Sequence, residues 1–84
     1  MRTDTDHESR FRRRAAALRG HRGITQVELS ALTGVSRMAL GRIEAGSRTV
    51  SLGEAISICE ALGTSLSAMT ATGPLEITEV VRLD

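Results

Sequence analysis

The spacing of hydrophobic residues predicts short helices along most of the chain. Phe11, Ala15 and Leu18 recur at helical intervals, so residues 8–19 are expected to form an amphipathic helix. Further helices are predicted at about residues 25–33, 36–45, 52–62 and 65–70, each bounded by glycine or by a residue that caps helices well. The pattern therefore favours an all-α fold with five helices.

The stretch from residue 24 to residue 46 is typical of two helices joined by a tight turn. Thr25 and Glu28 have the spacing of a capping box, in which each side chain accepts a hydrogen bond from the other residue's backbone N–H. Gly34 suits the positive φ that ends a helix, and Ser36 is a good cap for the next one. Two short helices around a glycine turn are the outline of a helix-turn-helix.

The same periodicity predicts which side chains face inward. In the helix pair these residues are Val27, Leu29, Leu32, Leu40 and Ile43. In the helix at 52–62 they are Leu52, Ala55, Ile56, Cys59 and Leu62, and the last helix adds Leu66 and Met69. Cys59 is interpreted as a small buried hydrophobic residue rather than as a reactive thiol.

After residue 70 the period changes from that of a helix to that of a strand. The apolar residues that alternate with polar ones are Leu75, Ile77, Val81 and Leu83. A single strand leaves its own backbone groups unpaired, so we expect it to pair with its copy in a second subunit. The alternatives are a segment that becomes ordered only when it binds a partner, and a flexible tail. The predicted organisation is a flexible N-terminus at 1–7, a helical domain at 8–70 and an extension at 71–84.

Composition narrows the class of protein. The 84 residues allow one small domain, and no apolar run approaches the ~18 residues that span a membrane. One cysteine and an N-terminus without an apolar signal region favour the cytoplasm. No catalytic constellation, phosphate loop or ligand cluster is recognisable, so we expect neither an enzyme nor a bound metal or cofactor.

Charge is distributed unevenly along the chain. Residues 1–48 hold ten basic and five acidic residues, a balance of +5, whereas residues 49–84 hold one basic and five acidic residues, a balance of −4. This polarity favours a basic face for an anionic polymer such as DNA. The arginines Arg10, Arg12, Arg13 and Arg14 crowd the first helix, where they form either a solvated face or phosphate contacts.

Short motifs occur along the helical part of the chain. They are T-Q-x-E-L at 25–29, G-V-S-R at 34–37 and R-I-E-x-G at 42–46, with S-L-x-E at 51–54 and A-L-G at 61–63 in the fourth helix. Together these motifs resemble the Cro/C1-type helix-turn-helix family of phage repressors and small bacterial regulators. The resemblance covers about residues 10–70. It implies a five-helix, lambda-repressor-like DNA-binding domain in a bacterial or phage-encoded protein.

The resemblance also implies roles for individual residues. The recognition helix, about Ser36–Ala45, would enter the major groove of double-stranded DNA. Its candidate base-reading residues are Arg37, Met38, Gly41 and Arg42. The candidate phosphate-binding residues are Thr25, Gln26, Ser36, Ser47 and Arg48. Arg19 and Glu44 match positions that form a structural ion pair in the family.

Two interpretations of Gly41 and two functions remain open. A glycine inside a helix is explained either by close approach of DNA to the backbone or by crowding within the protein or sequence drift. The leading functional hypothesis is a repressor that binds a two-fold operator as a homodimer. The alternative is the antitoxin of a toxin–antitoxin pair, in which the acidic second half of the chain and the possible strand would bind a protein toxin.

Overall fold

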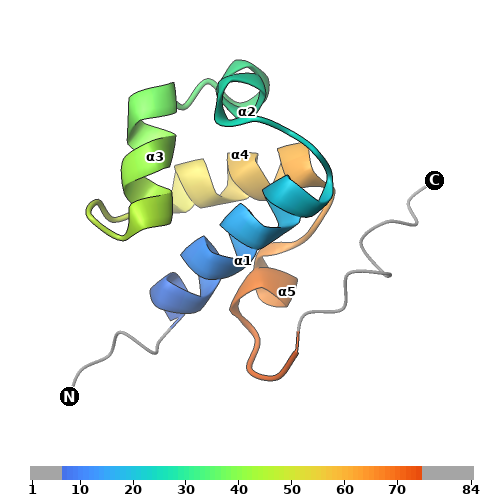
Figure 1. Cartoon of the computed structure of the whole chain (residues 1–84). Coiled ribbons are helices and arrows are strands. Elements are labelled where there is room, and N and C mark those ends of the chain that lie inside the picture. The colour runs from blue at the N-terminus through green and yellow to red at the C-terminus, as the bar shows by residue number, and fades with distance from the viewer. Residues whose placement is uncertain (1–6, 75–84) are drawn as a thin grey trace.

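The computed structural model describes residues 7–74, which form five helices joined by short loops (Figure 1). They are α1 (His7–His21), α2 (Gln26–Thr33), α3 (Arg37–Ala45), α4 (Leu52–Leu62) and α5 (Leu66–Thr70). No strand occurs within this range, and the predicted all-α, five-helix fold is confirmed. The predicted strand residues Leu75, Ile77, Val81 and Leu83 lie outside the described residues, as do residues 1–6.

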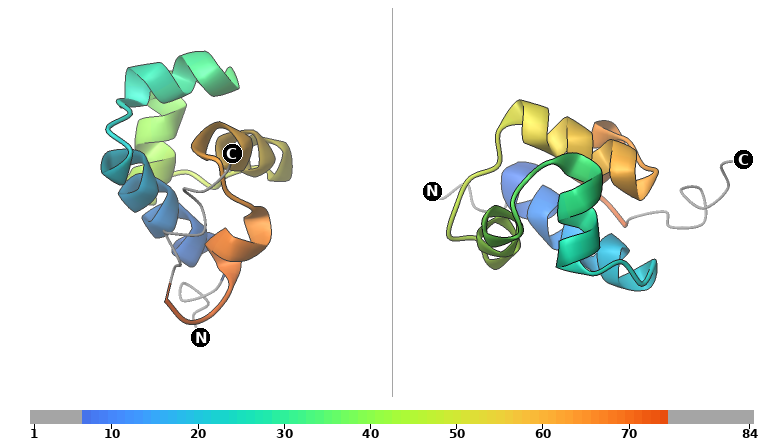
Figure 2. Two further views of the ribbon diagram at one scale, coloured as in Figure 1. Left: turned by 90° about the vertical axis from the view of Figure 1, so that its right-hand side faces the viewer. Right: turned by 90° about the horizontal axis from the view of Figure 1, so that it is seen from above.

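A mainly aliphatic core holds the helices together. α1 packs against α3, α4 and α5, while α2 packs against α3 and α4 (Figures 1 and 2). The buried hydrophobic residues are Phe11, Ala15, Leu18, Leu29, Val35, Leu40, Ile43, Ala55, Ile58, Cys59, Leu62 and Met69. Burial of each large side chain contributes about 1.5–3 kcal/mol, so this core is the main source of stability. α3 lies at one edge of the domain, with one side against the core and the other facing outward.

Local sequence signals set the ends of the helix pair. The Thr25 Oγ1 accepts the Glu28 N–H at 3.0 Å, and the Glu28 carboxylate accepts the Thr25 N–H at 2.8 Å, which completes the predicted capping box. Gly34 ends α2 with a φ of +79°, and the Ser36 Oγ accepts the Ala39 N–H at the start of α3. These contacts fix the turn between the two helices.

Position 46, at the end of α3, favours glycine for two reasons. Its φ of +82° is strained for residues with a side chain, and a Cβ there would lie 3.0 Å from the Arg12 guanidinium. Arg12 in turn donates to the Glu44 carbonyl at 3.4 Å. The end of α3 is therefore packed directly against α1.

The predicted inner face of α2 was wrong at two positions. Val27 and Leu32 are 61% and 63% exposed. The side of α2 that faces the domain instead carries Leu29 between polar residues, because Gln26 and Thr33 fall on the same helical stripe and are half-buried. The apolar residues of α2 alone therefore predicted an inner face that lies too far towards solvent.

The predicted inner face of α4 was also partly wrong. Leu52 and Ile56 are 68% and 43% exposed, whereas Ile58, which was not assigned to the core, is buried. Two neighbouring stripes of α4 are apolar, and periodicity alone does not choose between them. Packing against α1 and α2 selects the stripe that contains Ala55, Ile58 and Leu62.

The arginine run of α1 makes intramolecular contacts that neither sequence interpretation included. Arg10 Nε donates to the Thr70 carbonyl at 3.0 Å, and Arg14 Nη1 donates to the Ala68 carbonyl at 2.9 Å. Arg14 Nη2 also donates to the Gly73 carbonyl. These guanidinium groups satisfy carbonyls at and beyond the C-terminal end of α5, a helix too short to stand alone.

Candidate nucleic-acid interface

The outer side of α3 carries exposed basic and apolar side chains. Arg37 and Arg42 are exposed, and Met38 is 62% exposed. Leu40 and Ile43, on the opposite side, are almost fully buried and fix the helix to the core. Among residues 7–74 the Arg42 guanidinium has no hydrogen-bond or ion-pair partner, so its donors are available to a ligand.

An ion pair ties the end of α3 to the end of α1. Arg19 Nε and Nη2 contact the two carboxylate oxygens of Glu44 at 2.7 and 2.9 Å, and both side chains are largely buried. Arg19 Nη1 also donates to the Ile24 carbonyl at 2.8 Å. The predicted partners therefore lie in bidentate contact, the strongest geometry for this kind of pair.

The Glu44 carboxylate is held in its charged form. Burial by itself raises the pKa of Glu44, but hydrogen bonds from Arg19 and Gln26 outweigh that effect and hold the pKa below its usual value. The same contact with Glu44 raises the pKa of Arg19. Both partners thus remain ionised at neutral pH.

Gln26 connects this ion pair to the start of α3. Its Nε2 donates to Glu44 Oε1 at 2.9 Å, and its Oε1 accepts from Arg37 Nη1 at 3.3 Å. Its side chain also lies over Gly41. The structure therefore places Gln26, expected to hold a phosphate, in contact with a candidate base-reading residue.

Crowding in the protein does not require glycine at position 41. A Cβ on Gly41 would lie 3.7 Å from Gln26 Oε1, which is an ordinary van der Waals distance. The glycine is helical, with a negative φ, so an alanine would meet no backbone strain. The geometry therefore argues against crowding, and close approach of DNA and sequence drift are the interpretations that it leaves.

The two capping residues retain a free donor. The hydroxyl oxygens of Thr25 and Ser36 accept backbone N–H groups, and both residues are exposed. A hydroxyl that accepts such a bond keeps its proton for a second partner, such as a phosphate oxygen. Ser47, also exposed, instead directs its hydroxyl to the Arg42 carbonyl at 3.3 Å.

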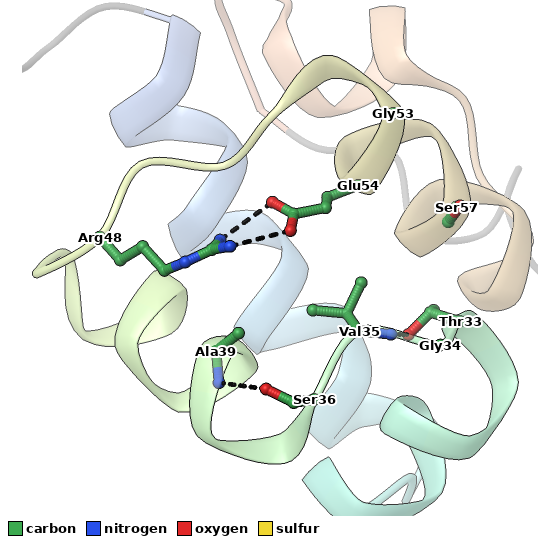
Figure 3. Close-up of a pocket in the computed structure, with 9 residues that line it drawn as sticks. All are labelled: Thr33, Gly34, Val35, Ser36, Ala39, Arg48, Gly53, Glu54 and Ser57. Carbon is green, nitrogen blue, oxygen red and sulfur yellow. Dashed lines mark hydrogen bonds and ion pairs between the residues drawn. The ribbon is translucent and has the colours of Figure 1, made fainter.

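Arg48 is already paired, which its position in the sequence did not reveal. Its guanidinium contacts both carboxylate oxygens of Glu54 at 2.9 Å across a shallow polar hollow (Figure 3). Ala39 of α3 and Ser36, the residue that caps α3, line the same hollow, so Arg48 lies beside the start of α3. The Arg48 hydrogen bond, with help from the Ser51 N–H, lowers the pKa of Glu54 to about 2.

The sequence contains a weak signal for Glu54 as the partner of Arg48. Glu54 has the spacing of a capping box with Ser51, and that box is present at the start of α4. A capping glutamate places its carboxylate just before the helix, where the preceding loop can supply a cation. The contact between Gln26 and Arg37 had no such signal, because it depends on how α2 crosses α3 (Figure 2).

Residues 7–74 were expected to hold no metal site, membrane span or reactive thiol. No cluster of three or more potential metal ligands occurs among them, and none of their helices is long and apolar enough to cross a bilayer. Cys59 is buried, and that burial raises the pKa of its thiol to about 11.

Comparison with known proteins identifies the family of this domain. The family model described as Helix-turn-helix, of the Cro/C1 type, matches residues 16–69. The match includes the whole of α2, α3 and α4 and nearly all of α5. Among curated proteins, none matches the chain.

Proposed function

The chain belongs to the Cro/C1-type helix-turn-helix family of DNA-binding transcription regulators, and on that basis we propose that it is a repressor that binds a two-fold operator as a homodimer. The observation that carries the proposal is the outer side of α3. There Arg37, Met38 and Arg42 are exposed on a helix whose other side is anchored in the core.

In this proposal α3 lies in the major groove and reads base edges. Arg42 or Arg37 donates to O6 and N7 of guanine, the commonest specific contact between proteins and DNA. Met38 packs against a thymine methyl group, and Gly41 allows the backbone of α3 to approach the groove. Because Arg42 has no partner among residues 7–74, it is the better candidate for the bidentate contact.

The phosphate contacts flank α3 in the same proposal. Thr25 and Ser36 donate through their free hydroxyl protons, and the N-terminal ends of α2 and α3 favour negative charge. Ser47 and Arg48 approach the DNA backbone from the loop that follows α3. Such contacts position the protein without specifying sequence.

Dimerisation supplies the remaining affinity. One helix-turn-helix contacts only a few base pairs, and two half-sites one helical turn apart, about 34 Å, are the usual solution. The extension at 71–84 is the proposed dimerisation segment. A chain that ends at Ala71 is then expected to lose dimer mass in sedimentation. An unchanged dimer would instead assign the interface to the described helices, where Leu52 and Ile56 of α4 are exposed.

Selection of bound DNA from a random pool tests the proposal directly. The expected result is an enriched motif with two inverted half-sites, together with affinity that falls steeply as salt is raised. Enrichment of a single half-site would contradict the dimeric repressor. The absence of any enriched motif, or affinity that does not depend on salt, would contradict sequence-specific binding by the basic side of α3.

A second candidate function is the antitoxin of a toxin–antitoxin pair. It is favoured by the acidic balance of residues 49–84 and by the exposed apolar pair Leu52 and Ile56 on α4. An added protein-binding surface would use both features. Purification from the native host distinguishes the two functions, because an antitoxin is expected to bring down a stoichiometric protein partner and a simple repressor is expected to appear as a homodimer.

A further inference from the structure

Arg22, just beyond the end of α1, has buried donors without an acceptor. Its guanidinium nitrogens Nε and Nη2 are shielded from solvent and have no hydrogen-bond partner in the described part of the chain. Within the same range, the Thr64 hydroxyl is the other buried side-chain group without a partner. A guanidinium is always charged and carries only donors, so enclosed N–H groups without an acceptor are costly. A carboxylate, which accepts through two oxygens, is the group that matches these donors best.

The chain after α5 turns back and runs along α1 towards Arg22 (Figure 1). The Thr70 carbonyl accepts from Arg10, near the start of α1. The Gly73 carbonyl accepts from Arg14, about one turn further along α1. Residues 70–73 therefore proceed from the N-terminal part of α1 towards its C-terminal end, where Arg22 lies about two turns beyond Arg14.

The chain beyond residue 74 is long enough to bring a carboxylate to Arg22. The Arg22 N–H donates to the Leu18 carbonyl at 3.0 Å, as in a helix, so Arg14 and Arg22 are separated by about 12 Å along the axis of α1. An extended chain covers about 10 Å from Gly73 to residue 76, and a glutamate side chain adds to that reach. Glu76 is the first acidic residue after the described part of the chain. It is therefore the nearest carboxylate that the rest of the chain offers.

We propose that the Arg22 guanidinium binds the Glu76 carboxylate of the same chain and so anchors the extension at 71–84 to the C-terminal end of α1. The two carboxylate oxygens satisfy the enclosed donors of Arg22. The contact itself does not depend on the proposed function, but its consequence rests on it. A dimerisation segment that starts from a fixed point on α1 would set the distance between the two copies of α3, and with it the spacing of the half-sites.

Arg22→Met in the full chain tests the contact through the sign of its effect on the Tm. Methionine keeps much of the length of the side chain and removes its charge and its donors. If Glu76 binds Arg22, the variant loses an ion pair, and the Tm is expected to fall by about 2–5 °C. If the guanidinium has no partner, the same variant removes buried, unpaired donors and raises the Tm. A higher Tm would overturn the inference.

Glu76→Gln tests the other end of the contact. The Tm is expected to fall somewhat less than in Arg22→Met, because an amide oxygen can still accept one hydrogen bond. The double variant should fall no further than Arg22→Met, since both changes remove the same contact. Glu79→Gln removes an equal charge three residues later and is the matched control, which should leave the Tm unchanged. Additive losses in the double variant, or equal losses from the two glutamine variants, would contradict a specific contact.

An NMR titration of the carboxyl groups does not depend on unfolding. In the wild-type chain the pKa of Glu76 is expected to lie below its ordinary value and to return to it in Arg22→Met. An ordinary pKa in the wild-type chain would overturn the inference, and this measurement decides if Arg22→Met does not fold.

A mixture of the two single variants distinguishes a contact within one chain from a contact between two copies. In mixed dimers a contact between copies would be restored and the Tm would recover, which would overturn the intrachain contact. A contact within one chain is not restored, and the Tm is expected to stay low. None of these measurements involves DNA, so failure of the wild-type chain to select a DNA motif would contradict only the proposed function.

Discussion

α1 and α3 both carry arginines on their outer sides, but the two helices use them differently. In α1, Arg10 and Arg14 donate to the carbonyls of Thr70 and Ala68 in α5. In α3, the Arg42 guanidinium has no partner among residues 7–74. The basic run that dominates the sequence is therefore occupied within the protein, whereas a single arginine further along the chain is available.

The difference shows that available donors matter more than local charge density. The last carbonyls of a helix carry partial negative charge and need donors, and the arginines of α1 supply them to α5. To bind a phosphate, Arg14 would have to give up hydrogen bonds within the protein. Arg42 would give up only water, so the same charge is more readily used for DNA on α3 than on α1.

Arg19→Ala is expected to have the largest effect, and the effect is on stability. The variant leaves the Glu44 carboxylate largely buried without its main partner. The expected loss is about 2–3 kcal/mol in the free energy of unfolding, somewhat below that of a fully buried pair. Thermal and denaturant unfolding measure it.

Arg13→Ala is the matched control for Arg19. The Arg13 guanidinium is exposed and donates to the Ser9 hydroxyl, so its loss should change the free energy of unfolding by less than about 0.5 kcal/mol. Equal losses in both variants would mean that the ion pair has no special structural role.

Arg42→Ala is expected to leave stability unchanged and to alter DNA recognition. Loss of one bidentate base contact should reduce discrimination at one base pair by about 1–3 kcal/mol. Arg14→Ala on α1 is the control, and it should not change preference at any base pair. If Arg42→Ala weakens binding to every DNA sequence to the same extent, Arg42 contacts phosphate. The arginine of α3 would then contribute to the affinity for DNA and not to the choice of sequence.

The sequence predicted those features that depend on neighbours close in the chain. Thr25 and Ser36 cap the helices as expected, and Gly34 takes the positive φ that its position in the turn requires. Capping and turn geometry involve residues two to four positions apart, so they can be read directly from the chain. Leu40 and Ile43 were also placed correctly, because α3 has one clear apolar stripe.

Features that depend on packing between helices could not be predicted in this way. The choice between Ile56 and Ile58 on α4 depends on where α1 and α2 lie. The partners of Arg10 and Arg14 lie 54–60 residues away in the sequence. The periodicity of one helix contains no information about such contacts, so the arginine run was interpreted only as surface or phosphate ligand.

Gly41→Ala is expected to change stability and DNA affinity in opposite directions. Alanine in a helix interior is more favourable than glycine by about 0.5–1 kcal/mol, and the added Cβ meets only ordinary contacts. If DNA approaches the backbone of α3 closely, the same methyl group weakens binding. Unfolding and DNA-binding measurements on one preparation give both signs.

Gly20→Ala in α1 is the control for Gly41. Gly20 is helical, and a methyl group added to it would have no neighbour within 4 Å, so the variant should gain similar stability and leave DNA affinity unchanged. If both variants leave DNA affinity unchanged, the outer side of α3 does not approach DNA more closely than α1 does, and sequence drift must explain Gly41.

Arg48 combines features of the arginines of α1 and of α3. Its guanidinium is bound within the protein, like those of α1, but it lies beside α3. Its partner Glu54 has a pKa lowered to about 2, so the pair persists at neutral pH. A lowered pKa stabilises the fold above the unfolded value near 4.3, and that contribution is lost as the pH falls from there towards 2. Glu54→Gln should remove this part of the acid sensitivity, which denaturant unfolding of both chains between pH 7 and pH 2 measures.

Glu54→Gln should also strengthen DNA binding, and this is the smallest of the predicted effects. Glutamine keeps the capping box with Ser51 and frees Arg48 for a phosphate. Affinity for all sequences is then expected to rise about two- to fivefold, and the salt slope to grow by about one. Glu28→Gln is the matched control, since it removes the same charge from the capping box of α2, where no arginine is bound. A larger gain from Glu54→Gln means that Arg48 was withheld from DNA by its partner, as the arginines of α1 are; equal gains mean that only the net charge changed.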